Sequence, residues 1–318
     1  MIKKSDIKNI YSIIIMIILA INPLMASSFS TTFYIEDNII TVDPISVVTS
    51  ISIVADFANQ VGEGLFTAES IVTGSENPHI YEPTPSEIEM VADADIFIRM
   101  GIDGLEPWVQ SVLDANPGVP VLELINSSMI EYDEIIEADN PHVWMDPNNA
   151  KTMVNSIYQE IITIDSANNE TYFTNKEEYL IELDDLLISI NEAYTELNGT
   201  KVIVHHPAFK YLLDLLGIIR LGAIEQREGS EPSPAHINNL IELINTEGVD
   251  FIISQPQLDD EVVNQIARDT NTEIVEITPL LGILGLVNYT GMMEYNLEAL
   301  QNPQPPSNIS SQWTMYLL

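Results

Sequence analysis

A long helical segment without a break constrains the fold more than any other feature of this sequence. Residues 175–198 contain neither proline nor glycine, and their apolar side chains recur every three or four positions, which is the pattern of an amphipathic α-helix. Gly199 follows and is suited to end a helix. The segment therefore predicts one helix of about 25 residues, which is longer than the usual helix of a globular domain.

Short apolar runs alternate with helical patterns on both sides of this segment. Runs such as ISVVTS, DIFIRMG, KVIV and DFIISQPQ are each followed by a helical pattern, which is typical of parallel sheets with crossover helices. We therefore predict an α/β fold of two βα lobes with parallel sheets, joined by one long rigid α-helix. The predicted parts are an N-terminal βα lobe over residues 45–170, the connecting helix over 171–199, a C-terminal βα lobe over 200–300 and a tail over 301–318.

The first residues have the pattern of an export signal. Lys3, Lys4 and Lys8 precede an apolar run over residues 10–21, and a small-residue stretch follows at 26–28. The run is shorter than the roughly 20 residues that a comfortable membrane span needs. We expect residues 1–26 to be a signal peptide or N-terminal anchor. The protein is then secreted, outside the cytoplasmic membrane and associated with the cell surface, anchored by this segment if it is not cleaved.

Charge and cysteine content exclude several classes of protein. The chain has 11 basic and 48 acidic residues, a net charge of −37, and such a surface repels nucleic acid. The acidic residues are spread along the whole sequence, which indicates solubility rather than a binding site. The acidic stretch EYDEIIEADN is accordingly expected to be a solvated loop. No cysteine is present, so disulfides, cysteine zinc sites and a lipid-modified cysteine are excluded.

Four of the five histidines fall in three short loops. The phrase NPH occurs at residues 77–79 and again at 140–142, and the pair His205 and His206 follows the apolar run KVIV. A single loop histidine needs no functional explanation. Three neutral imidazoles on loops that proline restrains are suited to bind a divalent transition metal. Metal binding is therefore the leading hypothesis.

Several phrases, in order, give the chain its resemblance to a known family. It resembles the cluster A-I solute-binding proteins of ABC transporters for zinc and manganese, which include zinc receptors and adhesin-like lipoproteins. The resemblance covers roughly residues 45–300 and rests on PHIYEPTPSEIEMVADADIFIRMG, NPHVWMDPNNAKTM, NKEEYLIELDDL, HPAFKYLLDLLG, EPSP and MMEYN. It implies a periplasmic-binding-protein-like fold of the helical-backbone type, a monomer, a transported metal ion, and a membrane permease with its ATPase as partners.

The resemblance also implies a set of metal ligands. His79, His142 and His206 match the family's histidine ligands. Successive residues of a strand face opposite sides, so His205 and His206 cannot both point to one site, and the family's phrase selects His206. His205 is then expected beside the site.

Trp144 and Asp146 are expected to support the second histidine. The indole is suited to pack beside the ligand, and the carboxylate is suited to orient a neighbouring group. Asp146 is equally suited to cap a helix that begins at Pro147, and we favour the cap.

The fourth ligand is where this chain departs from the family. Many relatives have an aspartate in a phrase resembling DPL, and here the phrase is ITPL with Thr278 in that position. We expect a water molecule to complete the site, with Glu276 as the alternative, although Glu276 is about 6–7 Å away along the strand. A histidine-rich ligand set favours Zn²⁺ over Mn²⁺.

Three functions remain open from the sequence. We favour the substrate-binding component of an ABC importer, not an enzyme, which captures zinc, or secondarily manganese, in the cleft between the lobes. The alternatives are a secreted zinc-dependent hydrolase with an open three-histidine site, using Glu82 or Glu276 as base, and a cell-surface adhesion protein with a structural metal. No HExxH motif supports the hydrolase.

Overall fold

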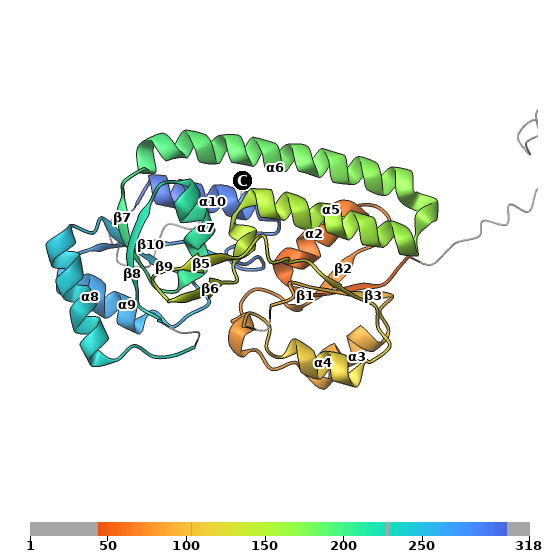
Figure 1. Ribbon diagram of the computed structural model, residues 1–318, viewed down its shortest axis with the longest axis horizontal. Helices are drawn as coiled ribbons and strands as arrows, with labels where there is room; N and C mark the ends of the chain where they lie inside the picture. The colour runs from red at the N-terminus through yellow and green to blue at the C-terminus, as the bar shows by residue number, and fades with distance from the viewer. Residues whose placement is uncertain (1–43, 103, 227–228, 304–318) are drawn as a thin grey trace, which may run out of the picture. The chain divides into compact units, whose positions relative to one another are not determined.

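The computed structural model describes residues 44–102, 104–226 and 229–303 (Figure 1). The predicted signal segment and nearly all of the predicted tail lie outside these residues. Within the described ranges, no helix is both long enough and apolar enough to cross a membrane.

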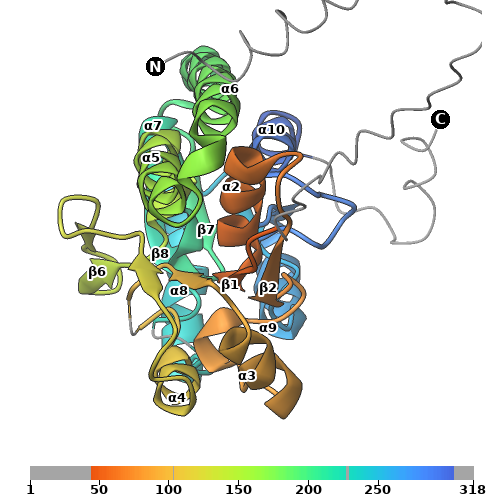
Figure 2. The ribbon, with the colours of Figure 1, turned by 90° about the vertical axis from the view of Figure 1, so that its right-hand side faces the viewer.

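The first half of the described chain forms a parallel sheet. Its strands have the order β2-β1-β3-β4, and they are β1 (Val47–Ile51), β2 (Ala68–Val72), β3 (Ile96–Arg99) and β4 (Val121–Glu123). Every residue of β1 and β3 is buried, as expected for central strands that are covered on both faces. Helix α2 (Ser52–Gly62) covers one face, and α3 (Pro85–Ala92) and α4 (Val109–Ala115) cover the other (Figures 1 and 2).

The second half repeats this architecture. The strand order is β10-β9-β7-β8, again all parallel, and the strands are β7 (Lys201–Val204), β8 (Ile219–Ala223), β9 (Phe251–Ser254) and β10 (Glu273–Glu276). The helices that accompany them are α7 (Lys210–Leu215), α8 (Pro234–Glu247), α9 (Glu261–Thr270) and α10 (Tyr289–Gln301). The prediction of two βα lobes with parallel sheets is confirmed.

Helix α6 (Asn169–Leu197) is the predicted long helix, with 29 residues and a length of about 44 Å at 1.5 Å per residue. It contacts α2 and α5 (Pro147–Ile164) of the first half, and α7 and α10 of the second. It begins at Asn169, two residues before the predicted start at 171, and Tyr172 is the first residue of its buried stripe. The lobe boundaries remain predictions, since the chain from Pro44 onward groups as one unit.

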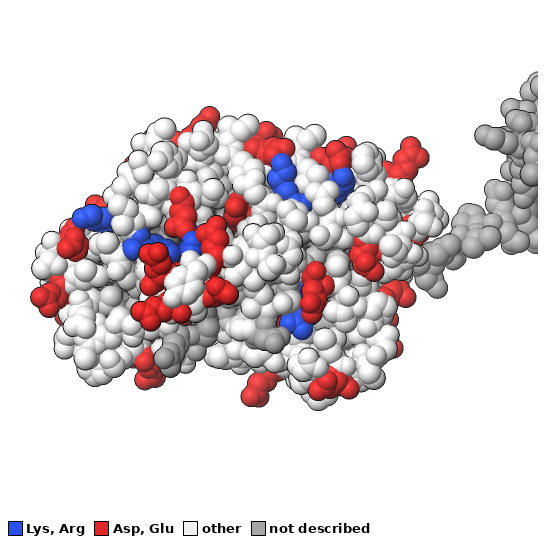
Figure 3. Space-filling view, viewed as in Figure 1, with Lys and Arg blue, Asp and Glu red and all other residues white. Residues whose placement is uncertain are grey.

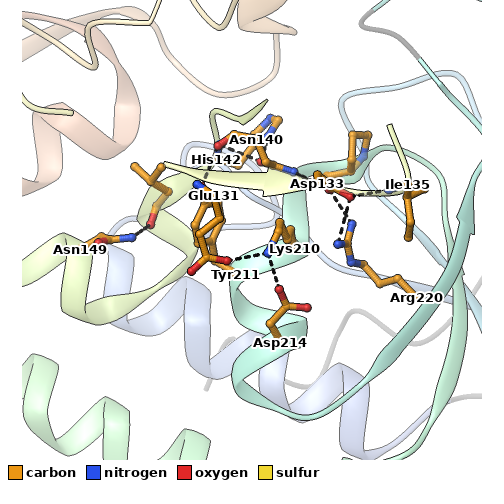
Figure 4. A network of polar contacts seen from close by, with 12 residues as sticks. Glu131, Asp133, Ile135, Asn140, His142, Asn149, Lys210, Tyr211, Asp214 and Arg220 are labelled. Carbon is orange, nitrogen blue, oxygen red and sulfur yellow. Dashed lines mark hydrogen bonds and ion pairs between the residues drawn. The ribbon is translucent and has the colours of Figure 1, made fainter. Parts of the chain in front are cut away.

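The segment EYDEIIEADN is a hairpin rather than the predicted loop, although its acidic side chains other than Asp133 are exposed, as predicted. Strands β5 (Glu131–Asp133) and β6 (Ala138–Asn140) pair antiparallel. The hairpin lies against the second half of the chain, where the fully buried Asp133 pairs with Arg220 of β8 at 2.8 Å (Figure 4). Buried partners from another part of the chain stabilise this acidic segment, and its own sequence does not reveal them. Elsewhere the acidic residues are scattered over the surface, as one face shows (Figure 3).

Candidate metal site

Three loops bring their histidines together at one point. His79 lies in the short helix η2 (Pro78–Ile80), His142 precedes η3 (Val143–Met145), and His206 precedes η5 (Pro207–Phe209). The His142 Nε2 atom is 3.2 Å from Nε2 of His79 and 3.3 Å from Nε2 of His206. All three side chains are buried, and in the described part of the chain they form one group with metal-binding potential.

The spacing of these nitrogen atoms suits a metal ion. Zinc binds imidazole nitrogen at about 2.0–2.1 Å, so two ligands of a tetrahedral site are about 3.3–3.4 Å apart. The two Nε2 separations of 3.2 and 3.3 Å are close to that value. An ion therefore fits among the three rings without a large rearrangement of the loops that position them.

Each imidazole is also held at its other nitrogen. All three partner atoms are oxygens that accept hydrogen bonds: Gly104 O for His79 at 2.9 Å, Asn140 Oδ1 for His142 at 3.0 Å and Glu225 Oε2 for His206 at 2.9 Å. Each Nδ1 therefore carries the proton, and each Nε2 presents a lone pair toward the other two rings. Such hydrogen bonds fix both the tautomer and the orientation that metal binding requires.

Burial keeps the rings of His79 and His142 neutral. It lowers the pKa of His79 to about 3, with the charge of His206 as a second cause. It also lowers the pKa of His142 well below 6.5, with the same neighbour contributing. Protons therefore compete weakly for the nitrogen atoms of these two histidines in the folded protein, which favours metal binding there at neutral and mildly acidic pH.

Asn140 connects two of the histidine loops. Its Oδ1 accepts from both N–H and Nδ1–H of His142, each at 3.0 Å. Its Nδ2 donates to Asp133 Oδ2 at 3.0 Å and to Pro207 O, next to His206, at 2.8 Å. Asp133 is in turn fixed by Arg220 (Figure 4). A buried polar network thus supports the second and third histidines together.

The residues expected beside the ligands have distinct roles. The ring of Trp144 lies 5.3 Å from that of His142, and its Nε1 donates to Pro279 O at 2.8 Å. Asp146 accepts from the Asn148 N–H at 2.8 Å and caps α5, so the predicted cap is confirmed. His205 is buried but lies outside the histidine group, as expected for the opposite face of the strand.

Neither residue considered for the fourth position lines the small cavity beside the histidines. Glu276 is exposed and pairs in register with Ser254, which places it on the face of the sheet opposite His206. The structure thus corrects the suggestion that Glu276 reaches the site. Thr278 is fully buried, and its hydroxyl donates to Leu280 O and accepts from Gln257 Nε2, both at 2.9 Å.

The partners of the imidazole Nδ1 atoms are not among the residues predicted from the sequence. The sequence does contain a pattern that marks Asn140, because asparagine precedes Pro-His in both phrases. In the first phrase Asn77 Oδ1 likewise accepts a hydrogen bond from the His79 N–H at 3.0 Å. This arrangement is a turn that asparagine favours. Gly104 and Glu225 had no such signal, because they are 25 and 19 residues from their histidines.

Comparison with known proteins places the chain among metal receptors. Residues 47–302 match the family described as "Zinc-uptake complex component A periplasmic". Manganese-binding lipoprotein MntA of Halalkalibacterium halodurans is 27% identical over 262 residues, which cover 80% of this chain and 86% of that protein. High-affinity zinc uptake system protein ZnuA of Bacillus subtilis is 26% identical over 284 residues, covering 82% and 88%.

Solved structures give the same fold. The periplasmic zinc binding protein TroA of Treponema pallidum has a TM-score of 0.74 at 20% identity, with 81% of this chain and 98% of that chain covered. At this identity the similarity shows the architecture alone.

Proposed function

The chain belongs to the family of the periplasmic component A of zinc-uptake complexes, and from this premise we propose how it acts. It is the extracytoplasmic substrate-binding component of an ABC importer, and it captures a divalent transition metal between its two lobes. His79, His142 and His206 bind the ion through their Nε2 atoms. The observation that carries the proposal is the convergence of these atoms, at separations of 3.2 and 3.3 Å, while every Nδ1 is held by an oxygen.

Zinc is the favoured substrate and manganese the second. Three imidazoles suit zinc, whereas manganese prefers oxygen ligands. Relatives named for each metal match this chain at similar identity, 27% for a manganese-binding lipoprotein and 26% for a zinc uptake protein.

The hydrolase and adhesion alternatives receive less support. The family is one of solute receptors, and the cavity at the histidines has a volume of only about 10 Å³. That space admits about one water molecule and leaves no room for an ester or peptide substrate. The proposed partners are a membrane permease with its ATPase, and the proposed location is outside the cytoplasmic membrane.

Thermal unfolding with and without metal tests the proposal. We expect zinc to raise the melting temperature of metal-stripped protein, because an ion that binds only the folded state stabilises it by roughly 4 kcal/mol at a thousandfold excess over Kd. Isothermal titration should give one zinc ion per chain. A melting temperature that zinc leaves unchanged would falsify the proposed function.

Single alanine variants test the ligand assignment. His79→Ala, His142→Ala and His206→Ala should each lose zinc in metal analysis after gel filtration, because water replaces an imidazole ligand poorly. His205→Ala is the matched control and should retain one ion. Loss of zinc from His205→Ala together with retention by His206→Ala would reverse the assignment of the third ligand.

A further inference from the structure

The histidine site contains an oxygen donor that the sequence did not point to. Gln255 follows strand β9, its side chain is only 6% exposed, and it lines the same small cavity as the three histidines. Among the described residues its Oε1 atom is buried and has no hydrogen-bond partner. A buried carbonyl oxygen without a partner is uncommon in native proteins and calls for an explanation.

The sheet places Gln255 beside His206. Val204 of β7 is paired with Ile253 of β9, and the ladder continues through a 2.7 Å hydrogen bond from the His205 N–H to Ile253 O. Side chains alternate along strands, so His206 and Gln255, each two residues beyond the registered pair, face the same side. His206 keeps an extended backbone, with φ −131° and ψ 147°.

From these observations we propose that the amide oxygen of Gln255 is the fourth ligand of the metal. The inference rests on the proposed function. It replaces the expected water, and it explains why Thr278 and Glu276 are not needed in the site. The resulting ligand set is three imidazoles and one amide oxygen, all of them neutral.

Gln257 is the competing residue, and its contacts argue for a supporting role. It also lines the cavity and also has a buried Oε1 without a partner in the described part of the chain. Its side chain is less buried than that of Gln255, and its Nε2 donates to Gly74 O at 3.1 Å and to Thr278 Oγ1 at 2.9 Å. These two hydrogen bonds fix the side chain of Gln257 against residues beside the site.

A neutral oxygen donor has consequences for selectivity. Carbonyl and carboxylate oxygens suit manganese better than imidazole does, so Gln255 broadens a histidine site toward manganese. A carboxylate at the same position adds negative charge beside the ion. Gln255→Glu should therefore raise the affinity for both metals, with the larger increase for manganese. Gln255→Leu should lower the affinity for both.

Competition titrations with a chromophoric chelator measure these effects on the full chain. We expect Gln255→Leu to raise the Kd for zinc at least tenfold and Gln255→Glu to lower the Kd for manganese at least tenfold. Gln110→Leu, on the exposed side of α4, is the matched control and should leave both values unchanged. The melting temperature of metal-free Gln255→Leu should equal or exceed that of the parent, because an apolar side chain replaces an unpaired buried oxygen.

Infrared difference spectra between loaded and metal-free protein separate ligation from a packing role. The amide carbonyl band of one glutamine should shift on zinc binding, and that shift should be missing in Gln255→Leu and present in Gln257→Leu. The inference is overturned if Gln255→Leu binds zinc with wild-type affinity. It is also overturned if Gln257→Leu, rather than Gln255→Leu, loses zinc affinity and the carbonyl shift. If the wild-type protein binds zinc and His142→Ala does not, the proposed function stands even when the Gln255 inference is overturned. If the wild-type protein binds no zinc, the proposed function fails first.

Discussion

At the scale of single residues, the asparagine of each NPH phrase fixes the backbone conformation of the histidine two positions later. Asn77 and Asn140 each accept a hydrogen bond from the backbone N–H of that histidine at 3.0 Å. Asn140 goes further, because the same Oδ1 also accepts from the ring of His142. One amide therefore shapes the turn, selects the tautomer and points Nε2 of His142 toward the other two histidines.

Removal of that amide should weaken metal binding without unfolding the protein. We expect Asn140→Ala to raise the Kd for zinc about 10- to 100-fold, the usual effect of losing a partner that orients a ligand. Zinc titrations of Asn140→Ala and of Asn238→Ala, an exposed asparagine on α8, provide the comparison. Equal affinity of the two variants would contradict a positioning role for Asn140.

At the scale of secondary-structure elements, a buried carboxylate lies where three helices meet. Asp56 of α2 accepts from the Tyr289 N–H of α10 at 2.8 Å and from the Tyr179 hydroxyl of α6 at 3.5 Å. Burial is the largest cause that raises its pKa from 3.8 to about 6. The folded protein thus binds this proton more tightly than the unfolded chain does.

This raised pKa predicts a specific dependence of stability on pH. The contribution of Asp56 to the free energy of unfolding is fully present below about pH 4 and is lost as the pH rises through about 6. Asp56→Asn mimics the protonated form, so at pH 8 we expect it to be about 1–3 kcal/mol more stable than the parent. That advantage should shrink toward pH 4.

Melting curves of the two metal-free proteins between pH 4 and 8 measure the difference. A stability difference between the two proteins that does not change with pH would show that burial does not raise the pKa of Asp56. Gln60→Leu serves as a control, because it removes the 3.1 Å hydrogen bond from Gln60 to Asp56 but keeps the carboxylate. This variant should show a pH dependence in the same direction as the parent and a stronger one, because the lost hydrogen bond lowers the pKa of Asp56.

At the scale of the whole described chain, α6 contacts helices of both lobes. No proline or glycine interrupts it, and sharp bends in helices nearly always need such a residue or an inserted group. A continuous helix that packs on both lobes resists a wide hinge motion between them. Metal entry then depends on the histidine loops and on slight rocking of the lobes.

Solution scattering measures this property directly. The radius of gyration of metal-free and zinc-loaded protein should agree within the error of the measurement. A helix-breaking variant such as Leu187→Pro, in the middle of α6, gives the contrast, since it introduces a kink. A marked compaction of the parent protein on zinc binding, as when two lobes close over a ligand, would rule out the rigid-helix account.

The sequence by itself determined the elements and the histidine loops of the proposed metal site. Periodicity predicted α6 and the alternation of strands and helices, because the spacing of apolar residues records which face each element buries. The paired NPH phrases and the His205–His206 pair identified the loops of the site, since proline and asparagine act on their own backbone. These are local effects, and a short stretch of chain encodes them fully.

Only the tertiary structure decided the environment of those histidines. Glu225, Gly104 and Gln255 reach the site because strands β7, β8 and β9 and the loop after β3 end near one another, and no local pattern marks them. The β5–β6 hairpin likewise exists through Asp133 and its buried partner Arg220, 87 residues away. Contacts between distant segments depend on how sheets and helices pack, and a sequence read one window at a time does not contain that information.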